Sequence, residues 1–284
     1  MQGKTVLITG ATAGIGKATA QALARQGAQV VLVGRSEPKT RAVRDELRSQ
    51  TGNPDVDFLL ADLSNLASVR RLAGEGRAHV PRVHVLINHA GGVNQNRQVT
   101  PDGFELTFAV NHLAPFLLTR ELLGTLRATP GARIVNVSSA AQAQGHIDFG
   151  DLMGERRYSP MRAYYQSKLA NVLFTYELAR RLTGSGVTAN ALHPGVVNSD
   201  FGGDMRGVMG LAMRAIKRFG AITPGEGART TVYLASSPEV EGVTGKYFEK
   251  QKPVRSGKES YDDATQRRLW DVSEELTRER VGAP

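Results

Sequence analysis

Tyr164 and Lys168 lie four residues apart within residues 160–182, a segment that the sequence predicts to be a long helix. Residues with this spacing occupy one face of a helix. An ammonium group beside a phenol stabilises the phenolate, so we expect Lys168 to lower the pKa of Tyr164 from about 10 toward neutrality. Such a phenol could act as a general acid or base. The same pair also arises by chance on helix surfaces, so the interpretation depends on the residues around it.

Polar residues that could join this pair lie where predicted strands end. Three strands end in Asn88-His89-Ala90-Gly91, in Ser138-Ser139 and in His193-Pro194-Gly195-Val196-Val197-Asn198-Ser199. Asn111 lies inside a predicted helix. Asparagine is a poor helix former, so an asparagine at such a position usually serves a specific structural or functional purpose. The carboxyl ends of parallel strands meet above one crevice. We therefore expect these residues to share one site.

A glycine-rich segment joins the first predicted strand to the first predicted helix. It reads Thr9-Gly10-Ala11-Thr12-Ala13-Gly14-Ile15-Gly16. Gly10 permits a tight turn, Gly14 lets the backbone approach a phosphate, and Gly16 allows close packing of helix and strand. Free N–H groups and the helix dipole then face an anion. Glycines that merely form a turn are the alternative, but the strand-to-helix context favours a dinucleotide site.

The residues near this segment distinguish between nucleotide sites. A Walker A loop is excluded, because the spacing to Lys17 is one residue too long and Ala18 replaces the Ser or Thr that would hold magnesium. The second predicted strand ends at Arg35, without the acid that usually accepts from the ribose of NAD. A guanidinium suits a 2′-phosphate, and Lys39 is nearby. These residues favour NADP(H) over NAD(H). The alternative is that Arg35 is an exposed loop residue with no role in binding.

A regular alternation of elements would position these residues. Strands are predicted at 4–9, 29–33, 56–61, 83–88, 133–138 and 187–192, and helices at 14–26, 36–50, from 64, at about 101–127 and at 160–182. Continuous apolar strands between helices favour a parallel sheet covered on both faces. Right-handed crossovers then give an α/β, doubly wound fold of the Rossmann type. No linker or repeat divides residues 1–284, so we expect a single domain.

Composition excludes several classes of site. The 284 residues contain no cysteine, which excludes disulfides, thiolate zinc sites and a cysteine nucleophile and agrees with a cytoplasmic location. The histidines lack metal-ligand spacing, so we expect no catalytic metal. The N-terminus lacks the apolar core of a signal peptide, and no run approaches the ~18 apolar residues of a membrane span.

The net charge of +9 suggests an anionic partner. The arginines, however, are dispersed among acidic residues on predicted helix faces, and no basic stripe is interleaved with aromatic residues. We therefore expect no nucleic-acid partner, and salt-dependent DNA binding would be the sign of one. A small basic part of the charge is expected to face the phosphates of NADP.

Together these motifs resemble the classical short-chain dehydrogenase/reductase family over essentially the whole chain. The glycine pattern, Asn88-His89-Ala90-Gly91, Ser139, Tyr164-x-x-x-Lys168 and Pro194-Gly195 appear in the order typical of that family. Residues 111–119, 167–174, 193–197 and 245–248 resemble more narrowly the retinol dehydrogenase branch, which includes the WW-domain oxidoreductase.

The resemblance implies roles for the catalytic residues. Ser139 would hold the substrate oxygen, with Ser138 as second choice, and Tyr164 would exchange the proton. Lys168 would lower the pKa of Tyr164 and bind the nicotinamide ribose. Asn111 would hold a water that links Lys168 to solvent. The implied reaction is a hydride transfer between NADP(H) and a carbonyl or alcohol, with the cofactor supplying the hydride.

The resemblance also implies a set of cofactor-binding residues. These are Gly10, Thr12, Ala13, Gly14, Ile15, Gly16, Arg35, Asp62, Leu63, Asn88, Ala90, Gly91, Tyr164, Lys168, Pro194, Gly195, Val197 and Ser199. Asp62 would contact the adenine, and Val197 and Ser199 would fix the nicotinamide carboxamide. Asn88 and its neighbours would line the cleft. His89 departs from the family, which usually has asparagine there; a tolerated replacement, altered packing near the cofactor and a catalytic role all stay open.

Two segments bear on the substrate and on assembly. Residues 200–224 are expected to form a lid, since Met205, Met209 and Met213 repeat at helical spacing and give an adaptable apolar surface. This favours a lipophilic or aromatic aldehyde or ketone; an ordinary packed helix or a weak membrane-surface contact is the alternative. Residues 257–284 are predicted as a surface helix docked by Leu269, Trp270 and Leu276. Helices 101–127 and 160–182 resemble those that build dimers in the family, whereas the tail would favour a monomer.

The sequence leaves two other functions open. A non-catalytic NADP-binding sensor would share the fold but would be expected to lose the serine, tyrosine and lysine that this chain keeps. A sugar-nucleotide epimerase uses a similar tyrosine–lysine pair, but with a different glycine spacing and a longer chain.

Overall fold

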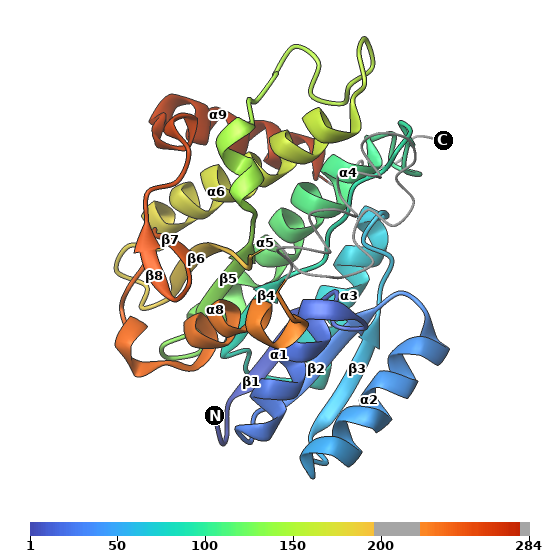
Figure 1. Ribbon diagram of the computed structural model, residues 1–284, viewed down its shortest axis with the longest axis vertical. Coiled ribbons are helices and arrows are strands. Elements are labelled where there is room, and N and C mark those ends of the chain that lie inside the picture. Colours follow the sequence, from blue (N-terminus) through green and yellow to red (C-terminus); the bar gives the residue numbers. More distant parts are fainter. Residues whose placement is uncertain (196–221, 279–284) are drawn as a thin grey trace.

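The computed structural model describes residues 1–195 and 222–278 and is built around one sheet (Figure 1). In these residues the sheet has eight strands in the order β3-β2-β1-β4-β5-β6-β7-β8. The strands are β1 (Thr5–Thr9), β2 (Gln29–Gly34), β3 (Val56–Leu60), β4 (Val85–Asn88), β5 (Arg133–Val137), β6 (Thr188–His193), β7 (Tyr247–Glu249) and β8 (Lys252–Val254). All neighbours pair in parallel except β7 and β8.

Helices cover both faces of this sheet (Figure 1). They are α1 (Gly14–Arg25), α2 (Glu37–Thr51), α3 (Leu66–His79), α4 (Leu106–Phe108), the π-helical turn η1 (Ala109–Leu113), α5 (Ala114–Arg127), the 3₁₀ helix η2 (Ala140–Gln144), α6 (Pro160–Arg181), α8 (Pro224–Ser236), the short η3 (Pro238–Val240) and η4 (Lys258–Tyr261), and α9 (Asp263–Leu276). One large apolar core joins α3, α5 and α6 to the sheet, a second joins α1, α2 and α8, and a small third cluster joins α6 to β6 and β7.

The predicted doubly wound α/β domain is confirmed. The chain winds outward from β1 in two directions, so β1 and β4 are neighbours although two strands separate them in sequence. In sheets of this kind ligands bind in the crevice outside the carboxyl ends of the strands where the strand order reverses, and here that point lies at β1 and β4. The glycine segment and Asn88-His89-Ala90-Gly91 follow these two strands.

The predicted helix 101–127 is wrong at its start and in its continuity. A turn at residues 100–104, with Gly103 at φ 87°, precedes it. The Glu105 carboxylate then accepts hydrogen bonds from the N–H groups of Thr107 and Phe108, at 2.8 and 2.7 Å, and so begins α4. The π-helical turn η1 interrupts the helix before α5. Such turns frequently lie at functional sites, and this one carries Asn111.

The sequence analysis missed η2, α8, β7 and β8. For α8 a signal was present, because Thr223 and Glu226 form a reciprocal capping box and Pro224 occupies the first turn. The strands β7 and β8 have three residues each, too few for a periodic pattern.

The predicted tail helix docked by Leu269, Trp270 and Leu276 forms as α9, with the opposite side of the helix exposed. Its Trp270 is 6% exposed, with its ring centroid 5.0 Å from that of Phe116 and 5.9 Å from that of Phe174. The guanidinium of Arg181 lies 4.3 Å from the centre of the indole. The helix therefore covers part of the face that α5 and α6 would otherwise present to solvent.

Two kinds of feature are absent from the described residues. Within 1–195 and 222–278, no helix combines the length and apolar character needed to cross a bilayer. In the same ranges, no three His, Asp or Glu side chains are grouped as metal ligands would be.

His112 makes the stability of this core depend on pH. Its imidazole packs among Phe108, Phe116 and Phe174, and burial lowers its pKa to about 4. Because the unfolded chain binds a proton near pH 6.5 and the native imidazole does not, native stability falls as the pH drops from 6.5 toward 4. We expect His112 to account for a loss of about 2 kcal/mol between pH 7 and pH 5.

Urea unfolding at the two pH values would measure this contribution. His112→Gln should reduce the pH dependence by about this amount, with the share of the similarly buried His89 remaining, whereas His146→Gln should not, because the His146 side chain is 72% exposed. An unchanged pH dependence in His112→Gln would contradict the assignment.

Candidate active site

The glycine loop between β1 and α1 packs directly on the loop that follows β4. A Cβ atom on Gly10, which has φ 70°, would lie 2.7 Å from the Cα of Ala90, and one on Gly16 would lie 2.2 Å from the Gly10 carbonyl oxygen. The Thr9 hydroxyl accepts hydrogen bonds from the N–H groups of His89 and Ala90, at 3.0 and 3.2 Å. No side chain larger than hydrogen fits at either glycine.

The first turn of α1 is open to an anion. Ala13, its N-cap residue, offers no side-chain acceptor, and the turn contains no acidic residue. Gly14, at φ 53°, brings the backbone into the turn. Thr12 and Ile15 are half-buried beside it. Uncapped N–H groups at a helix start bind phosphate well, so these residues fit a dinucleotide.

Residues predicted for the adenosine half lie at the ends of β2 and β3. Arg35 and Lys39 are exposed, and neither forms an ion pair within the part of the chain that the structure describes. The Asp62 carboxylate accepts from the N–H and hydroxyl of Ser64, at 3.0 and 2.7 Å, which fixes its orientation. Leu63 packs against the core. Arg35 and Asp62 thus follow neighbouring strands at one edge of the sheet.

The predicted catalytic side chains come together beside this loop. Tyr164 and Lys168 share a face of α6, with the Lys168 Nζ 5.6 Å from the centre of the Tyr164 ring. The same Nζ donates to the Val137 carbonyl oxygen at 3.2 Å. Ser139 follows β5 by two residues and caps η2, where its hydroxyl accepts from the N–H of Ala141 at 3.2 Å. A hydrogen bond also links the Ser139 hydroxyl to the Tyr164 phenol.

The predicted lowering of the Tyr164 pKa is wrong for this structure. Burial raises the pKa of Tyr164 to about 12, and the hydrogen bond with Ser139 only partly opposes this effect. Burial likewise lowers the pKa of Lys168 to about 8. Burial removes water from the charged forms of both groups, and the ammonium of Lys168 donates a hydrogen bond to the Val137 carbonyl oxygen.

The two serines at the end of β5 have different environments. The Ser138 hydroxyl is buried and donates to the Lys168 carbonyl oxygen at 2.7 Å, which ties β5 to α6. Ser139 is half-buried and contacts Tyr164. This geometry favours Ser139 for substrate contact, in the order that the sequence analysis ranked them.

Asn111 fastens the loop after β4 to the helix that carries Tyr164. Its Oδ1 accepts from the N–H of Gly92 at 2.8 Å, and its Nδ2 donates to the Gly92 carbonyl and the Ser167 hydroxyl, both at 2.9 Å. Ser167 in turn donates to the Tyr164 carbonyl at 2.8 Å. At Gly91 a Cβ atom would lie 3.0 Å from the Asn111 Oδ1 and 3.4 Å from the Lys168 Nζ. The predicted water between Asn111 and Lys168 stays a prediction.

The Asn88 side chain does not line the cleft, contrary to the prediction. It is 3% exposed and its Nδ2 donates to the Asn136 Oδ1 at 2.8 Å and to the Thr119 hydroxyl at 3.1 Å. Asn136 then donates to the Thr175 hydroxyl at 2.9 Å. Successive side chains on a strand alternate between faces, and Asn88 faces α5 and α6. This polar ladder, which sequence reasoning missed, ties β4 and β5 to both helices.

The remaining predicted residues follow β6. Gly195 has φ 93°, and a Cβ atom there would lie 2.6 Å from the Ile222 Cδ1, so the turn after Pro194 requires glycine. Val197 and Ser199 lie outside the described residues, as does most of the predicted lid 200–224.

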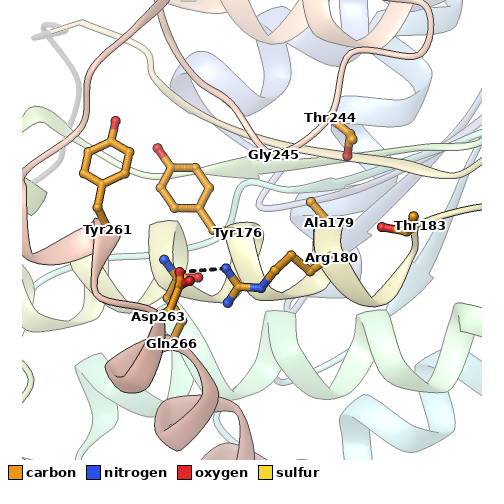
Figure 2. A pocket seen from close by; sticks show the side chains of 9 residues that line it. All are labelled: Tyr176, Ala179, Arg180, Thr183, Thr244, Gly245, Tyr261, Asp263 and Gln266. Carbon is orange, nitrogen blue, oxygen red and sulfur yellow. Dashed lines mark hydrogen bonds and ion pairs between the residues drawn. The ribbon is translucent and has the colours of Figure 1, made fainter.

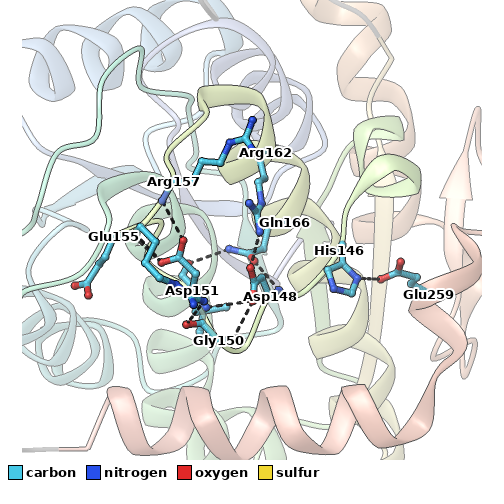
Figure 3. A network of polar contacts seen from close by, with 11 residues as sticks. His146, Asp148, Gly150, Asp151, Glu155, Arg157, Arg162, Gln166 and Glu259 are labelled. Carbon is cyan, nitrogen blue, oxygen red and sulfur yellow. Dashed lines mark hydrogen bonds and ion pairs between the residues drawn. The ribbon is translucent and has the colours of Figure 1, made fainter.

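A polar network anchors the insertion between Ser139 and Tyr164 to α6 (Figure 3). Gln166, two residues after Tyr164, accepts from the N–H of Asp148 at 3.0 Å and donates to the Leu152 carbonyl at 2.9 Å. The Asp148 carboxylate pairs with Arg162 at 2.5 Å. Sequence reasoning missed Gln166, although a polar residue on the buried helix between Tyr164 and Lys168 was a signal.

A separate pocket of about 350 Å³ lies near the far end of α6 (Figure 2). Tyr176, Arg180, Tyr261 and Asp263 contribute to its lining, with Arg180 and Asp263 paired at 2.9 Å. Tyr176 is twelve residues beyond Tyr164, or about 18 Å along the helix. None of the predicted site residues lines this pocket, so it is distinct from the crevice above β1 and β4.

Comparison with known sequences identifies close relatives. The family model described as short chain dehydrogenase matches residues 4–207. Human retinol dehydrogenase 14 is 44% identical over 293 residues, which cover 96% of this chain and 86% of that protein. Human polyprenol dehydrogenase is 41% identical over 280 residues, which cover 96% of this chain and 85% of that protein.

Solved structures share the fold. An uncharacterised protein from Mycobacterium paratuberculosis is similar with a TM-score of 0.79 and 36% identity, over 99% of this chain and 96% of that one. The RhlG/NADP active-site complex from Pseudomonas aeruginosa is similar with a TM-score of 0.71 and 26% identity, over 87% of this chain and 94% of that one.

Gly16→Ala tests whether the glycine loop holds a dinucleotide. Its Cβ would overlap the Gly10 carbonyl, and relieving such an overlap costs about 1–3 kcal/mol. We expect at least about tenfold weaker NADP binding by fluorescence titration. Gly124→Ala, where no atom lies within 4 Å of the added methyl group, is the control and should bind normally. Equal affinities in the two variants would place the dinucleotide elsewhere.

Proposed function

The chain belongs to the short-chain dehydrogenase family, in its retinol dehydrogenase branch, and we propose that it interconverts a carbonyl compound and an alcohol using NADP(H). The observation that carries this proposal is the cluster of Ser139, Tyr164 and Lys168 beside the glycine loop. A protein that only sensed NADP would need the loop but not the cluster.

The dinucleotide, when bound, supplies or accepts the hydride. The open first turn of α1 would hold its phosphates, and the absence of side chains at Gly10 and Gly16 lets the glycine loop pack closely against Ala90 and against itself beside that turn. Arg35 would pair with a 2′-phosphate, supported by its exposure at the end of β2 and by the lack of an acid there. The NADP in the similar RhlG complex agrees with this preference.

Tyr164 is proposed to donate a proton to the substrate oxygen during reduction. With its pKa raised to about 12, the phenol is protonated at neutral pH, which is the form that reduction needs. Ser139 would hydrogen-bond to the same oxygen as negative charge develops on it. Lys168, charged below its pKa of about 8, would stabilise the phenolate that remains.

The raised pKa of Tyr164 also bears on the reverse reaction, alcohol oxidation. Alcohol oxidation requires the phenolate, which is scarce at neutral pH when burial raises the pKa of Tyr164. The free protein therefore holds Tyr164 in the protonated form that reduction uses.

A lipophilic substrate is supported by the names of the relatives. Retinol and polyprenol, named in two of them, are both apolar alcohols. The apolar residues Met205, Met209 and Met213 are consistent with such a substrate. We therefore propose an apolar aldehyde or ketone as the substrate for reduction.

Tyr164→Phe tests the proton transfer. Removing the hydroxyl deletes the proposed acid, so we expect carbonyl reduction, followed by NADPH absorbance, to fall at least about 100-fold. NADPH binding should stay nearly intact. The control is Tyr165→Phe, which removes the same group from the neighbouring tyrosine and should keep most of the activity. Activity of Tyr164→Phe above a few per cent would refute the assignment.

Arg35→Glu tests the cofactor preference. The change removes a donor and introduces an acid suited to a ribose hydroxyl, so NADPH should bind at least about tenfold more weakly while NADH gains relative to it. Arg41→Glu makes the same charge change on the exposed side of α2 and should leave the preference unaltered. If both variants kept the wild-type ratio of NADPH to NADH affinity, Arg35 would not be the residue that determines the cofactor preference.

A further inference from the structure

His89 lies at the junction of the glycine loop and the loop after β4. Its N–H donates to the Thr9 hydroxyl at 3.0 Å. Its Cδ2 lies 2.8 Å from the position that a Cβ atom on Gly16 would take. The imidazole therefore packs against the first turn of α1, where the phosphates of a dinucleotide are proposed to bind.

The two ring nitrogens of His89 are without partners in the described part of the chain. Nδ1 is sealed from solvent and has no hydrogen bond. The residue as a whole keeps partial exposure, and Nε2 is not among the sealed atoms. Buried polar groups are normally paired, so an imidazole in this position calls for a ligand or a change of protonation.

The charged group that acts on the His89 imidazole is the ammonium of Lys168. Burial, followed by the ammonium of Lys168 on α6, lowers the pKa of His89 to about 4. Two other titratable groups on α6 and α1 lie in the neighbouring turns: Tyr164, which is neutral near pH 7, and Lys17, which is paired with Glu46 at 2.6 Å. The strand β1 contributes only the uncharged Thr9. The free protein thus keeps His89 neutral.

We propose that His89 contacts the bound dinucleotide and takes up a proton when that anion enters the cleft. The inference rests on the proposed function, since it requires a dinucleotide in this cleft. The phosphates would offset the field of Lys168 and give an imidazolium, which donates from both nitrogens, an acceptor.

Linkage sets the sign of the effect. A group whose pKa is higher in the complex than in the free protein strengthens binding as the pH falls through the higher value. If the pKa of His89 returns toward its ordinary 6.5, binding at pH 6.0 would take up as much as about three quarters of a proton. The affinity would then increase up to about fourfold between pH 7.5 and pH 6.0.

The other titratable residues of the cluster cannot produce this signal at pH 6.0. Lys168, with its pKa of about 8, is already charged at that pH with or without a ligand. Tyr164, with its pKa of about 12, keeps its proton in both states.

Calorimetric titration with NADP⁺ at pH 6.0, in two buffers of different ionisation enthalpy, counts the protons taken up. The comparison is between the wild type and His89→Asn, which carries the residue usual in the family. Titration of the NADP⁺ itself is common to both proteins and cancels. We expect the wild type to take up more protons than the variant, and only the wild type to gain the additional affinity at pH 6.0.

A nitrogen-15 spectrum of the wild-type imidazoles, with and without NADP⁺, reads the protonation of His89 without any substitution. A shift of its titration to higher pH on binding is expected. Equal proton uptake in the two proteins, or an unchanged titration of His89 in a saturated complex, would overturn the inference while leaving the proposed function in place. If the wild type bound no NADP⁺, the proposed function would fall with it.

Discussion

The contact between the glycine loop and the loop after β4 is the constraint on which the site depends. Gly10 and Ala90 approach so closely that a Cβ atom at position 10 would overlap the neighbouring backbone, and Thr9 links the two loops through two hydrogen bonds. These loops follow adjacent parallel strands, so their distance is set by the spacing of β1 and β4. Holding them together leaves the first turn of α1 facing the crevice, and it also fixes where His89 and Gly91 lie.

Buried hydrogen bonds transmit this geometry to the catalytic helix. The ladder from Asn88 through Asn136 to Thr175 crosses the interior between the sheet and α6, and Asn111 clamps the loop after β4 to the turn that holds Tyr164. In an apolar interior such groups must pair, so each bond specifies one relative position of strand and helix. Asn111 lies in the π-helical turn η1, between α4 and α5, and from there its side chain reaches Gly92 in the loop after β4.

Burial, more than charge pairing, decides the protonation of the site. It raises the pKa of Tyr164 to about 12, lowers that of Lys168 to about 8 and lowers that of His89 to about 4. All three groups are therefore biased toward their neutral forms, as expected for a crevice with little solvent. Beside the catalytic residues, an anionic ligand that enters such a crevice meets the ammonium of Lys168 and a histidine whose neutral state that ammonium helps to maintain.

The sequence by itself determined the first six strands and their alternation with helices, the glycine loop and the pairing of Tyr164 with Lys168, because these depend on local periodicity, turn chemistry and spacing along one helix. The tertiary structure decided what depends on distant residues: the partners of the Asn88 side chain and the π-helical turn that carries Asn111. It also decided the pKa of Tyr164. The pKa of this phenol depends on how far the surrounding residues exclude water from it, and the spacing of residues along the chain does not show that.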